Sequence, residues 1–505
     1  MTEKHNRNDA LILSILVILL TFFFVVLSQR RLIAPDEGFY LMASRLVMEG
    51  RIPYLDFFYP QMPVLPYLYG IWMKLFGISW QSGRALSGVF AALSGVIVYL
   101  QVRRFWQVRT AALAAVLIFC VSSMTFPWLT LAKGYASSTF FLLLAFCLAD
   151  PAAPKRSPLT YVGCGLSFAL AVGCRAYLVV CLPVLLWMLW LGGRLRFKEL
   201  LYFFAGSALI GLPVGALLIS DTDAFLFNNL GYHLTRSPHS LHRELASKNL
   251  IIQKLLGFES SDQLQSSQMA LLLWISFAGA AYTFFRQRKI YSEVTMAILL
   301  IGISLLPDPS YVQYFCVVVP FLIICILRAL QGLWTDLLSS NLQRRLGFAG
   351  SALLLMIFAL PFPHDYERFT RTGDGVIGID NPRNARDWNI PAVNEVAAQI
   401  ETLINPGAVV LSFWPGYIFG TDAVALPYTE NHFGWPAAQR LGVERSDRYK
   451  ILSPGGMQRA IEAKEPQYIV MRGKKIGGIT HARIESSGYL PAKSVNSVTI
   501  FVRSE

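Results

Sequence analysis

Two neighbouring carboxylates, Asp36 and Glu37, stand in the stretch APDEGFY, shortly after the apolar run Ala10–Ser28. This run has the length and composition of a membrane-spanning helix, so the two acids lie where the chain leaves the membrane. Lys and Arg, rather than acids, usually occupy such positions near lipid headgroups. An acid at this surface can act as a general base that takes a proton from a hydroxyl or amine of a substrate.

Other roles are open to the same two acids. Asp36 could cap a helix that begins near Gly38, with Glu37 in its first turn, or both could be solvated loop residues. The pair could also help to hold a divalent cation, which is the one cofactor that these residues indicate. The sequence contains neither a CxxC pair nor an HExxH pattern, so no residues are assigned as metal ligands.

The composition places the chain in a membrane. Of its 505 residues, 54% are hydrophobic and 15% are charged, and the mean hydropathy is +0.47, whereas soluble domains carry about 25% charged residues. Its net charge of +13 is typical of the basic loops of membrane proteins, so membrane lipids and not nucleic acid are the expected partners. The seven cysteines lie in apolar stretches and are expected to be buried thiols.

About eleven apolar stretches are long enough, or nearly so, to cross a bilayer. They are Ala10–Ser28, Ala85–Val102, Thr110–Pro127, Tyr135–Leu148, Leu159–Gly173, Ala176–Leu191, Leu200–Ile219, Met269–Phe285, Val294–Leu306, Phe315–Leu330 and Leu346–Leu360. The sequence therefore predicts a polytopic α-helical membrane protein, and a retained first span rather than a cleaved signal peptide.

Basic residues between the spans predict the orientation in the plasma (inner) membrane. Five basic clusters fall on one side if the N-terminus is cytoplasmic, and they include Arg103–Arg104, Lys155–Arg156 and Arg344–Arg345. Three basic residues of the first loop oppose this orientation, namely Arg30, Arg31 and Arg51. The five clusters outweigh them, so we expect the Asp36–Glu37 loop and everything after Pro361 to lie outside the cell membrane.

Two domains are expected from the distribution of apolar residues. Residues 1–362 form the membrane domain, with a long exterior loop at residues 32–83, and residues 363–505 form an exterior (periplasmic) soluble α/β domain. In this tail, AVVLSF, YIVMR and SVTIFVR are typical of short buried strands. The stretches AVNEVAAQIETLI and SPGGMQRAIEAKEP are typical of helices.

The first-loop acids, the stretch GRIPYLDFFYPQMP behind them, the number of spans and the exterior tail resemble the GT-C membrane glycosyltransferases. The branch resembled is glycosyltransferase family 39, with its protein mannosyltransferases and aminoarabinose-to-lipid-A transferases. The resemblance implies a sugar donor carried on polyprenyl phosphate, an inverting transfer at the exterior face, Asp36 as the base, and Glu37 as its support or a cation ligand. Relatives often carry a Lys-Pro step in this loop, whereas this chain reads Gln61-Met62-Pro63, so either another cation meets the donor phosphate or the donor chemistry differs.

Lys133 and Arg175 are the expected replacements for that lysine. They lie between spans three and four and between spans five and six, at exterior ends that are otherwise poor in basic residues. A cation there would stabilise the negative charge that develops on a leaving phosphate. The alternative is that each side chain snorkels to lipid phosphate. If both bind the donor, they should face one cavity together with Asp36.

Further substrate contacts are expected in three loops. Tyr59 and Gln61 belong to the first loop, and His233 and Arg236 to the exterior loop NNLGYHLTRSPHSLHRELASKN, whose three histidines lack the spacing of a zinc site. This basic loop is expected to order over the donor or acceptor, and a merely solvated loop is the alternative. Tyr311 and Tyr314 lie in PDPSYVQYF, where the resemblance implies donor contacts, although aromatic anchors at the membrane edge are an alternative. The stretch TENHFGWP is expected to rim the acceptor entrance.

These observations favour a glycosyltransferase that moves a hexose or pentose from a polyprenyl-phosphate donor to a lipid, glycan or protein acceptor. Two other functions stay open, namely a transporter or flippase of lipid-linked sugars and a non-catalytic envelope assembly protein. A transporter would carry ionisable residues in the middle of its spans, whereas the charges in this chain lie mainly at span ends.

Overall fold

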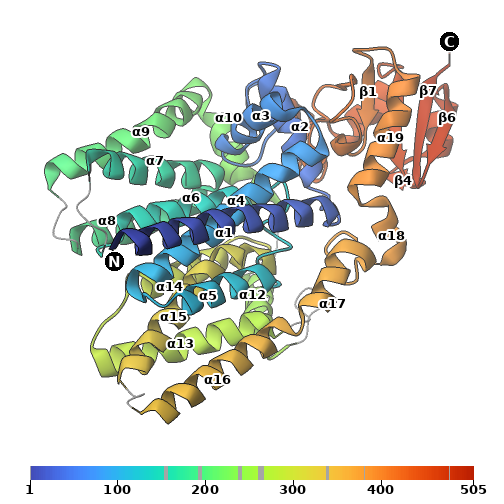
Figure 1. The fold of residues 1–505 in the computed structure, drawn as a ribbon. Helices are drawn as coiled ribbons and strands as arrows, with labels where there is room; N and C mark the ends of the chain where they lie inside the picture. Colours follow the sequence, from blue (N-terminus) through green and yellow to red (C-terminus); the bar gives the residue numbers. More distant parts are fainter. Residues whose placement is uncertain are drawn as a thin grey trace. The chain divides into compact units, whose positions relative to one another are not determined.

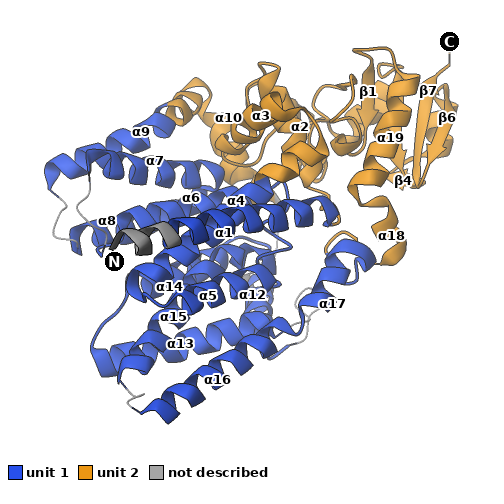
Figure 2. Cartoon of the chain, in the orientation of Figure 1, with its two compact units in different colours: residues 1–31, 87–212, 239–376 blue, residues 32–86, 213–238, 377–505 orange. Residues whose placement is uncertain are grey.

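The computed structural model describes residues 2–152, 157–191, 196–236, 241–259, 267–336, 340–379, 381–476 and 478–504. Its chain forms two compact units (Figure 2). Unit 1 comprises residues 1–31, 87–212 and 239–376, and unit 2 comprises residues 32–86, 213–238 and 377–505. The predicted division at residue 362 follows chain order, whereas these units follow packing, so the first loop is grouped with the tail.

Unit 1 is built from helices (Figure 1). They are α1 (Thr2–Arg30), α4 (Trp80–Phe105), α5 (Arg109–Val121), α6 (Gly134–Ala149), α7 (Pro158–Cys174), η1 (Ala176–Cys181), α8 (Leu182–Leu191), α9 (Phe197–Ser220), α12 (Leu241–Leu256), α13 (Gln268–Gln287), α14 (Ser292–Ser304), η3 (Val312–Val317), α15 (Val319–Asp336), α16 (Asn341–Ala359), α17 (Phe362–Glu367) and η4 (Arg368–Thr372). The first turns of α4 and the last turns of α9 are assigned to unit 2.

The described residues contain six helical segments that are long and apolar enough to cross a membrane. These segments begin at Asp9, within α1, and at Trp80, Phe197, Gln268, Val319 and Asn341. Five shorter apolar helices of 10–17 residues accompany them. Each predicted span overlaps one of these helices, which confirms the polytopic helical fold class. The basic segments around Lys155 and Arg194 lie outside the described residues.

Helices α7 and α9 meet through two glycines. A Cβ atom at Gly165 would lie 1.9 Å from the carbonyl oxygen of Phe203, and one at Gly206 would lie 2.0 Å from that of Val162. Only a hydrogen atom fits at either position, so the two backbones approach as closely as in membrane helix pairs that pack through small residues.

Unit 2 combines helices with the sheet of the tail. Its helices are α2 (Glu37–Met48), α3 (Val64–Phe76), α10 (Thr222–Leu226), η2 (Phe227–Gly231), α11 (Tyr232–Arg236), α18 (Pro382–Asp387), α19 (Ile390–Leu403), η5 (Pro415–Tyr417), α20 (Gly434–Leu441), α21 (Val443–Arg448), α22 (Pro454–Glu462) and α23 (His481–Ser486). Its strands are β1 (Val409–Ser412), β2 (Val424–Ala425), β3 (Tyr468–Arg472), β4 (Lys475–Ile476), β5 (Ile479–Thr480), β6 (Tyr489–Val495) and β7 (Val498–Arg503).

Five of these strands form one mixed sheet in the order β2-β1-β3-β7-β6. Strand β1 pairs parallel with β2 and β3, whereas β7 pairs antiparallel with β3 and β6. The three predicted strands correspond to β1, β3 and β7, which carry the buried apolar residues of the core. Strand β6 escaped prediction because most of its residues are exposed, so it lacks the apolar run of a buried strand.

The two predicted helices of the tail are also confirmed, as α19 and α22. Each begins with the same local device. The side chain of Asn389 accepts a hydrogen bond from the N–H of Ala392, and the side chain of Ser453 accepts one from Gly456. A proline lies in the first turn of each helix, Pro391 at the second position of α19 and Pro454 at the first position of α22, where its missing N–H is not needed.

Candidate active site

Asp36 directly precedes helix α2 in unit 2. Its side chain is half-buried and makes no capping bond to the N–H groups of the helix. The backbone carbonyl of Asp36 accepts a bond from the N–H of Tyr40 at 3.4 Å. Asp36 therefore stands at the N-cap position with Glu37 in the first turn, as the capping alternative expected, but the carboxylate of Asp36 makes no capping bond.

The backbone around Asp36 is held by Trp414 from the tail. The indole Nε1 of Trp414 donates to the carbonyl oxygen of Pro35 at 2.6 Å. A Cβ atom at Gly38 would come within 2.8 Å of the same indole, so only glycine allows this approach. Trp80 stacks on Trp414 with ring centroids 5.6 Å apart. The position of Asp36 thus depends on contacts between the first loop and the tail within unit 2.

Glu37 is engaged in a buried ion pair. Arg84 donates to both of its carboxylate oxygens, at 2.8 Å from Nε and 2.6 Å from a terminal nitrogen, and both side chains are 0% exposed. The N–H of Ala34 donates to the same carboxylate at 2.8 Å, and Arg84 also reaches the carbonyl of Leu32 at 3.1 Å. These contacts tie the segment that carries Asp36 to helix α4. A role of Glu37 in the chemistry or in holding a cation stays a prediction.

Aromatic rings surround the start of α2. Phe39 and Tyr40 follow Asp36 by three and four residues, so all three share one helix face. The ring of Tyr59 lies 6.2 Å from that of Phe39 and 6.3 Å from that of Tyr40. The backbone N–H of Tyr59 donates to the side-chain oxygen of Asn228 at 3.0 Å, which fixes its segment.

The predicted contacts Gln61 and His233 lie next to Tyr59 in unit 2. The Nε2 atom of His233 lies 3.1 Å from the carbonyl oxygen of Pro60, and the hydroxyl of Tyr54 donates to the carbonyl of Gln61 at 2.6 Å. Arg236 ends helix α11, but its side chain lies outside the described residues. The structure thus places six predicted site residues in one unit, namely Asp36, Glu37, Tyr59, Gln61, His233 and Arg236.

His432, from the stretch TENHFGWP, belongs to the same neighbourhood. Its ring centroid lies 6.4 Å from that of Phe39 and 4.3 Å from that of Phe433. Burial lowers the pKa of His432 to about 4, against an opposing attraction from the carboxylate of Asp36. The imidazole is therefore neutral at pH 7 and lies within electrostatic reach of Asp36.

Glu430 joins this stretch to the first loop. Its carboxylate is buried and lies 2.8 Å from a guanidinium nitrogen of Arg51. Burial raises the pKa of Glu430, and the charge of Arg51 opposes that rise. Arg51 also donates to the carbonyl of Asp56 at 2.6 Å. Arg51, one of the three basic residues that opposed the predicted orientation, therefore has partners within unit 2.

Lys133 and Arg175 come together in unit 1, around the ring of Tyr135. The guanidinium carbon of Arg175 lies 3.9 Å from the centroid of this ring, and the ammonium of Lys133 lies 6.0 Å from it. Both side chains are buried, with 8% and 4% exposure. Arg175 also donates to the hydroxyl of Tyr177 at 3.4 Å. A side chain that snorkels keeps its charged end in water, so the burial of Lys133 and Arg175 argues against snorkelling. Their binding of a phosphate stays a prediction.

Tyr311 directly precedes helix η3 and Tyr314 lies within it, and their rings lie 5.7 Å apart in an edge-to-face arrangement. On the same short helix, the thiol of Cys316 lies within electrostatic range of both Arg175 and Lys133. Gln313 precedes it by one turn of this helix and has a buried side-chain oxygen without a hydrogen-bond partner among the described residues. The region therefore borders the Lys133–Arg175 pair, and donor contacts by the two tyrosines stay a prediction.

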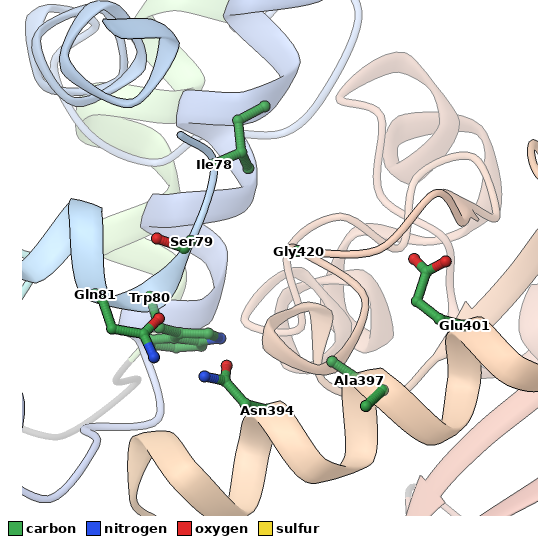
Figure 3. A pocket seen from close by; sticks show the side chains of 9 residues that line it. Ile78, Ser79, Trp80, Gln81, Asn394, Ala397, Glu401 and Gly420 are labelled. Atoms are coloured by element: carbon green, nitrogen blue, oxygen red, sulfur yellow. The ribbon is translucent and has the colours of Figure 1, made fainter. Parts of the chain in front are cut away.

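A hollow with a volume of about 220 Å³ lies in unit 2 between the start of α4 and helix α19. Ser79, Gln81, Asn394 and Glu401 supply its polar side chains. Figure 3 shows Gln81 on one helix and Asn394 on another, α19, with Glu401 further along α19. The hollow includes none of the predicted site residues.

Among the described residues, no three His, Cys, Asp or Glu side chains gather closely enough to form a metal site. His233 and His242, the two histidines of the exterior loop among these residues, therefore belong to no such cluster. His239 lies outside the described residues.

Sequence reasoning missed Arg84 and the position of His432. Arg84 stands directly before the predicted span Ala85–Val102, and a lone arginine at the edge of an apolar run was a usable sign of a buried partner. His432 is 396 residues from Asp36 in the chain. No local pattern indicates that such distant residues meet.

Comparison with known proteins supports the resemblance. Residues 60–219 match the family described as dolichyl-phosphate-mannose-protein mannosyltransferase. The undecaprenyl phosphate-α-4-amino-4-deoxy-L-arabinose arabinosyl transferase of Erwinia tasmaniensis is 31% identical over 226 residues, which cover 42% of this chain and 40% of that protein. The transferase of the same description from Pseudomonas paraeruginosa is 32% identical over 210 residues, or 38% of this chain and 37% of that protein. The matched stretch thus spans about two fifths of either relative.

Solved structures extend the similarity of fold to the whole chain. The structure of ArnT from Cupriavidus metallidurans bound to undecaprenyl phosphate has a TM-score of 0.64 at 15% identity and covers 98% of both chains. An oligosaccharyltransferase from Archaeoglobus fulgidus has a TM-score of 0.50 at 15% identity, over 91% of this chain and 69% of that one. The resemblance stated from the sequence is therefore supported over residues 60–219 by sequence, and the chain as a whole has the fold of ArnT.

Proposed function

We propose that this multi-pass membrane protein is a glycosyltransferase that uses a polyprenyl-phosphate-linked sugar as donor. The observation that carries the proposal is the half-buried carboxylate of Asp36, which directly precedes helix α2 without capping it and lies within electrostatic reach of a neutral imidazole, on a segment surrounded by aromatic rings. The proteins similar in sequence are transferases whose names include undecaprenyl phosphate and a sugar.

In the proposed reaction, Asp36 takes the proton of an acceptor hydroxyl or amine. The acceptor oxygen or nitrogen then forms a bond to the anomeric carbon of the donor sugar, while the bond between that carbon and the phosphate oxygen breaks. Polyprenyl phosphate leaves with the electron pair of the broken bond. A carboxylate positioned as general base contributes typically 10²–10⁴-fold to such a step.

Arg175 and Lys133 are the proposed ligands of the donor phosphate. A phosphate gains negative charge as it leaves, and two buried cations stabilise that charge better than solvated ones do. Their common position around Tyr135 supports this role, because one phosphate has several oxygens for two cations. Tyr311 and Tyr314, from the adjoining segment, are proposed to contact the same donor.

Membrane orientation belongs to the proposal as well. A cytoplasmic N-terminus would place the Asp36 loop and the α/β tail on the exterior face, where a lipid-linked sugar would be used. The basic clusters between the spans support this orientation. The acceptor is proposed to be a lipid, glycan or protein on that face.

The test compares the purified full-length protein with its Asp36→Asn variant. Sugar release from undecaprenyl-phosphate-α-4-amino-4-deoxy-L-arabinose and transfer to lipid A are followed by mass spectrometry. We expect Asp36→Asn to lose transfer at least about a hundredfold, because the amide cannot take the proton. Asp422→Asn, which changes an exposed carboxylate of the same unit, is the matched control and should keep full activity.

Equal turnover by Asp36→Asn and the wild type would reject Asp36 as the base. No turnover by the wild type with any polyprenyl-phosphate sugar would favour the transporter or the assembly protein instead. Thermal unfolding of both variants shows whether a loss of activity reflects chemistry or folding.

A further inference from the structure

The stretch Asn431–Trp435 contains three buried nitrogen atoms that have no hydrogen-bond partner among the described residues. They are Asn431 Nδ2, His432 Nδ1 and Trp435 Nε1. Buried nitrogen atoms in folded proteins are nearly always hydrogen-bonded, because an unpaired one loses its bonds to water without replacement. Three such atoms within five residues therefore point to a ligand that supplies the missing partners.

The other contacts of this stretch show that it is held in place. The side-chain oxygen of Asn431 accepts from the N–H of Phe433 at 3.0 Å, and its carbonyl accepts from Gly434 at 3.2 Å. The ring of Trp435 packs edge-to-face on Phe413 of the tail, 5.5 Å between centroids. The three nitrogen atoms are thus presented by a fixed backbone, so their lack of partners is not a feature of a poorly packed loop.

The surroundings of these atoms match a sugar. Sugar hydroxyls accept hydrogen bonds from N–H groups, and the C–H faces of a sugar ring pack against aromatic rings. Phe39 and Phe433 lie edge-to-face with centroids 5.6 Å apart, and both lie close to the ring of His432. Asp36 exerts its charge on the same imidazole. A sugar hydroxyl bound here would lie next to the proposed base.

We propose that Asn431, His432 and Trp435 bind the sugar headgroup of a lipid acceptor beside Asp36. This inference rests on the proposed function, because Asp36 is taken as the base that activates the acceptor. It adds residues from the tail that determine which acceptor is bound, a role that the first loop alone does not supply.

A lipid acceptor is favoured by the surface of unit 2. Helix α3 packs on α2 and exposes three large apolar side chains, Ile71, Leu75 and Phe76, at 55%, 73% and 62%. Neighbouring apolar side chains on one helix are typical of a surface that enters the headgroup region of a membrane. A headgroup that reaches the Asp36 neighbourhood from that surface would remain attached to its acyl chains.

The neutral state of His432 fits this role. A charged imidazolium beside Asp36 would form an ion pair with the carboxylate and compete with the acceptor hydroxyl for it. The neutral ring forms no such ion pair, and one ring nitrogen can bond to the acceptor as donor or acceptor according to its tautomer.

The test measures binding without turnover, in the full-length Asp36→Asn protein, by native mass spectrometry. Trp435→Phe removes the indole N–H and keeps the ring on Phe413, and His432→Gln removes the ring nitrogen at the δ position. Trp72→Phe is the matched control, because its N–H is already bonded to the carbonyl of Ser82 at 2.9 Å. The probes are lipid A and phosphatidylglycerol, which carries no sugar ring.

We expect Trp435→Phe and His432→Gln each to weaken binding of lipid A about tenfold, the effect of one lost hydrogen bond. Binding of phosphatidylglycerol should change less than about twofold, and Trp72→Phe should leave both lipids unaffected. Unchanged affinity for lipid A in both variants would overturn the inference. So would equal losses for the two lipids, or a parent protein that prefers phosphatidylglycerol. Since binding is measured without turnover, a failure here is separate from a failure of the transfer assay.

Discussion

The acid in unit 2 and the two cations in unit 1 are built in opposite ways. Asp36 is half-buried, and its neighbour His432 is held neutral by burial. Lys133 and Arg175 are buried more fully, against the ring of Tyr135. The electron-rich face of a ring favours a cation next to it. The comparison shows that aromatic rings lie against buried cations in one unit and around a partly accessible acid in the other.

A second contrast lies within unit 2, between Asp36 and its neighbour Glu37. One peptide bond separates them, yet Glu37 is fully buried in an ion pair with Arg84 whereas Asp36 remains partly accessible. The helix begins between them and directs the two side chains to different surroundings. We therefore interpret Glu37 as a residue that positions the segment on which Asp36 stands.

The largest expected effect follows from breaking this contrast with Glu37→Gln. The substitution removes the negative charge that faces Arg84 and leaves a buried guanidinium without its counter-charge, which costs about 3–5 kcal/mol of folding free energy. We expect a large fall in thermal stability of the purified protein, measured by intrinsic fluorescence. Asp36→Asn should retain the stability of the wild type while losing activity.

Glu49→Gln is the control for Glu37→Gln. Glu49 follows the same helix and pairs with Arg45 at 2.6 Å, but its side chain is 45% exposed. An exposed pair contributes roughly 0–1 kcal/mol, so this variant should unfold close to the wild-type temperature. If Glu37→Gln were as stable as Glu49→Gln, the ion pair with Arg84 would not be what fixes the Asp36 segment.

A smaller effect is expected from Arg175→Ala in unit 1. The loss of a cation at the proposed donor phosphate should lower kcat/KM for the donor about 10–100-fold, with little change in acceptor affinity. Lys133→Ala should act in the same direction. Arg175→Lys keeps the charge but loses the flat contact with Tyr135, so we expect an intermediate value. Steady-state kinetics with varied donor concentration provide the measurement.

Arg328→Ala separates donor binding from packing. Arg328 also lies over an aromatic ring of unit 1, 3.7 Å from the centroid of Phe105, and it pairs with Glu293 at 2.8 Å. Its removal should cost stability and leave the donor kinetics of the remaining folded protein unchanged. Donor kinetics that fall equally in Arg175→Ala and Arg328→Ala would remove Arg175 from the proposed site.

Much of this fold could be predicted from the sequence because its determinants are local. Apolar runs predict the spans, and short runs of β-branched residues predict β1, β3 and β7. The proximity of Lys133 and Arg175 could also be predicted from the sequence, because both stand at ends of spans expected on one side of the membrane. In each case, the pattern and the structure that it predicts occupy the same stretch of chain.

The remaining parts of the candidate site depend on contacts between distant residues. Arg84 lies 47 residues beyond Glu37, and Trp414 reaches Pro35 across 379 residues. Strand β6 was missed for a different reason, because an exposed strand carries no apolar run. A single sequence holds no information on which distant polar groups pair, so the positioning of Asp36 could be found only from the structure.

The pH dependence of stability is the smallest of the three effects and sharpens the comparison between a neutral imidazole and charged cations. His432 has a pKa of about 4 in the folded protein and about 6.5 when unfolded. Between these values the unfolded state binds more protons, so stability is fully present above pH 6.5 and falls as the pH drops towards 4. We expect a loss of about 1–2 kcal/mol that wild type shows and His432→Gln lacks.

Asp36 and the Glu430–Arg51 pair are present in both proteins, and the raised pKa of Glu430 acts in the opposite direction, so the difference between the proteins isolates His432. Unfolding temperatures measured from pH 7.5 to 4.5 provide the check. Parallel curves for the two proteins would mean that His432 accepts a proton as readily in the folded state as in the unfolded one, and that the acid of unit 2 has a charged neighbour after all.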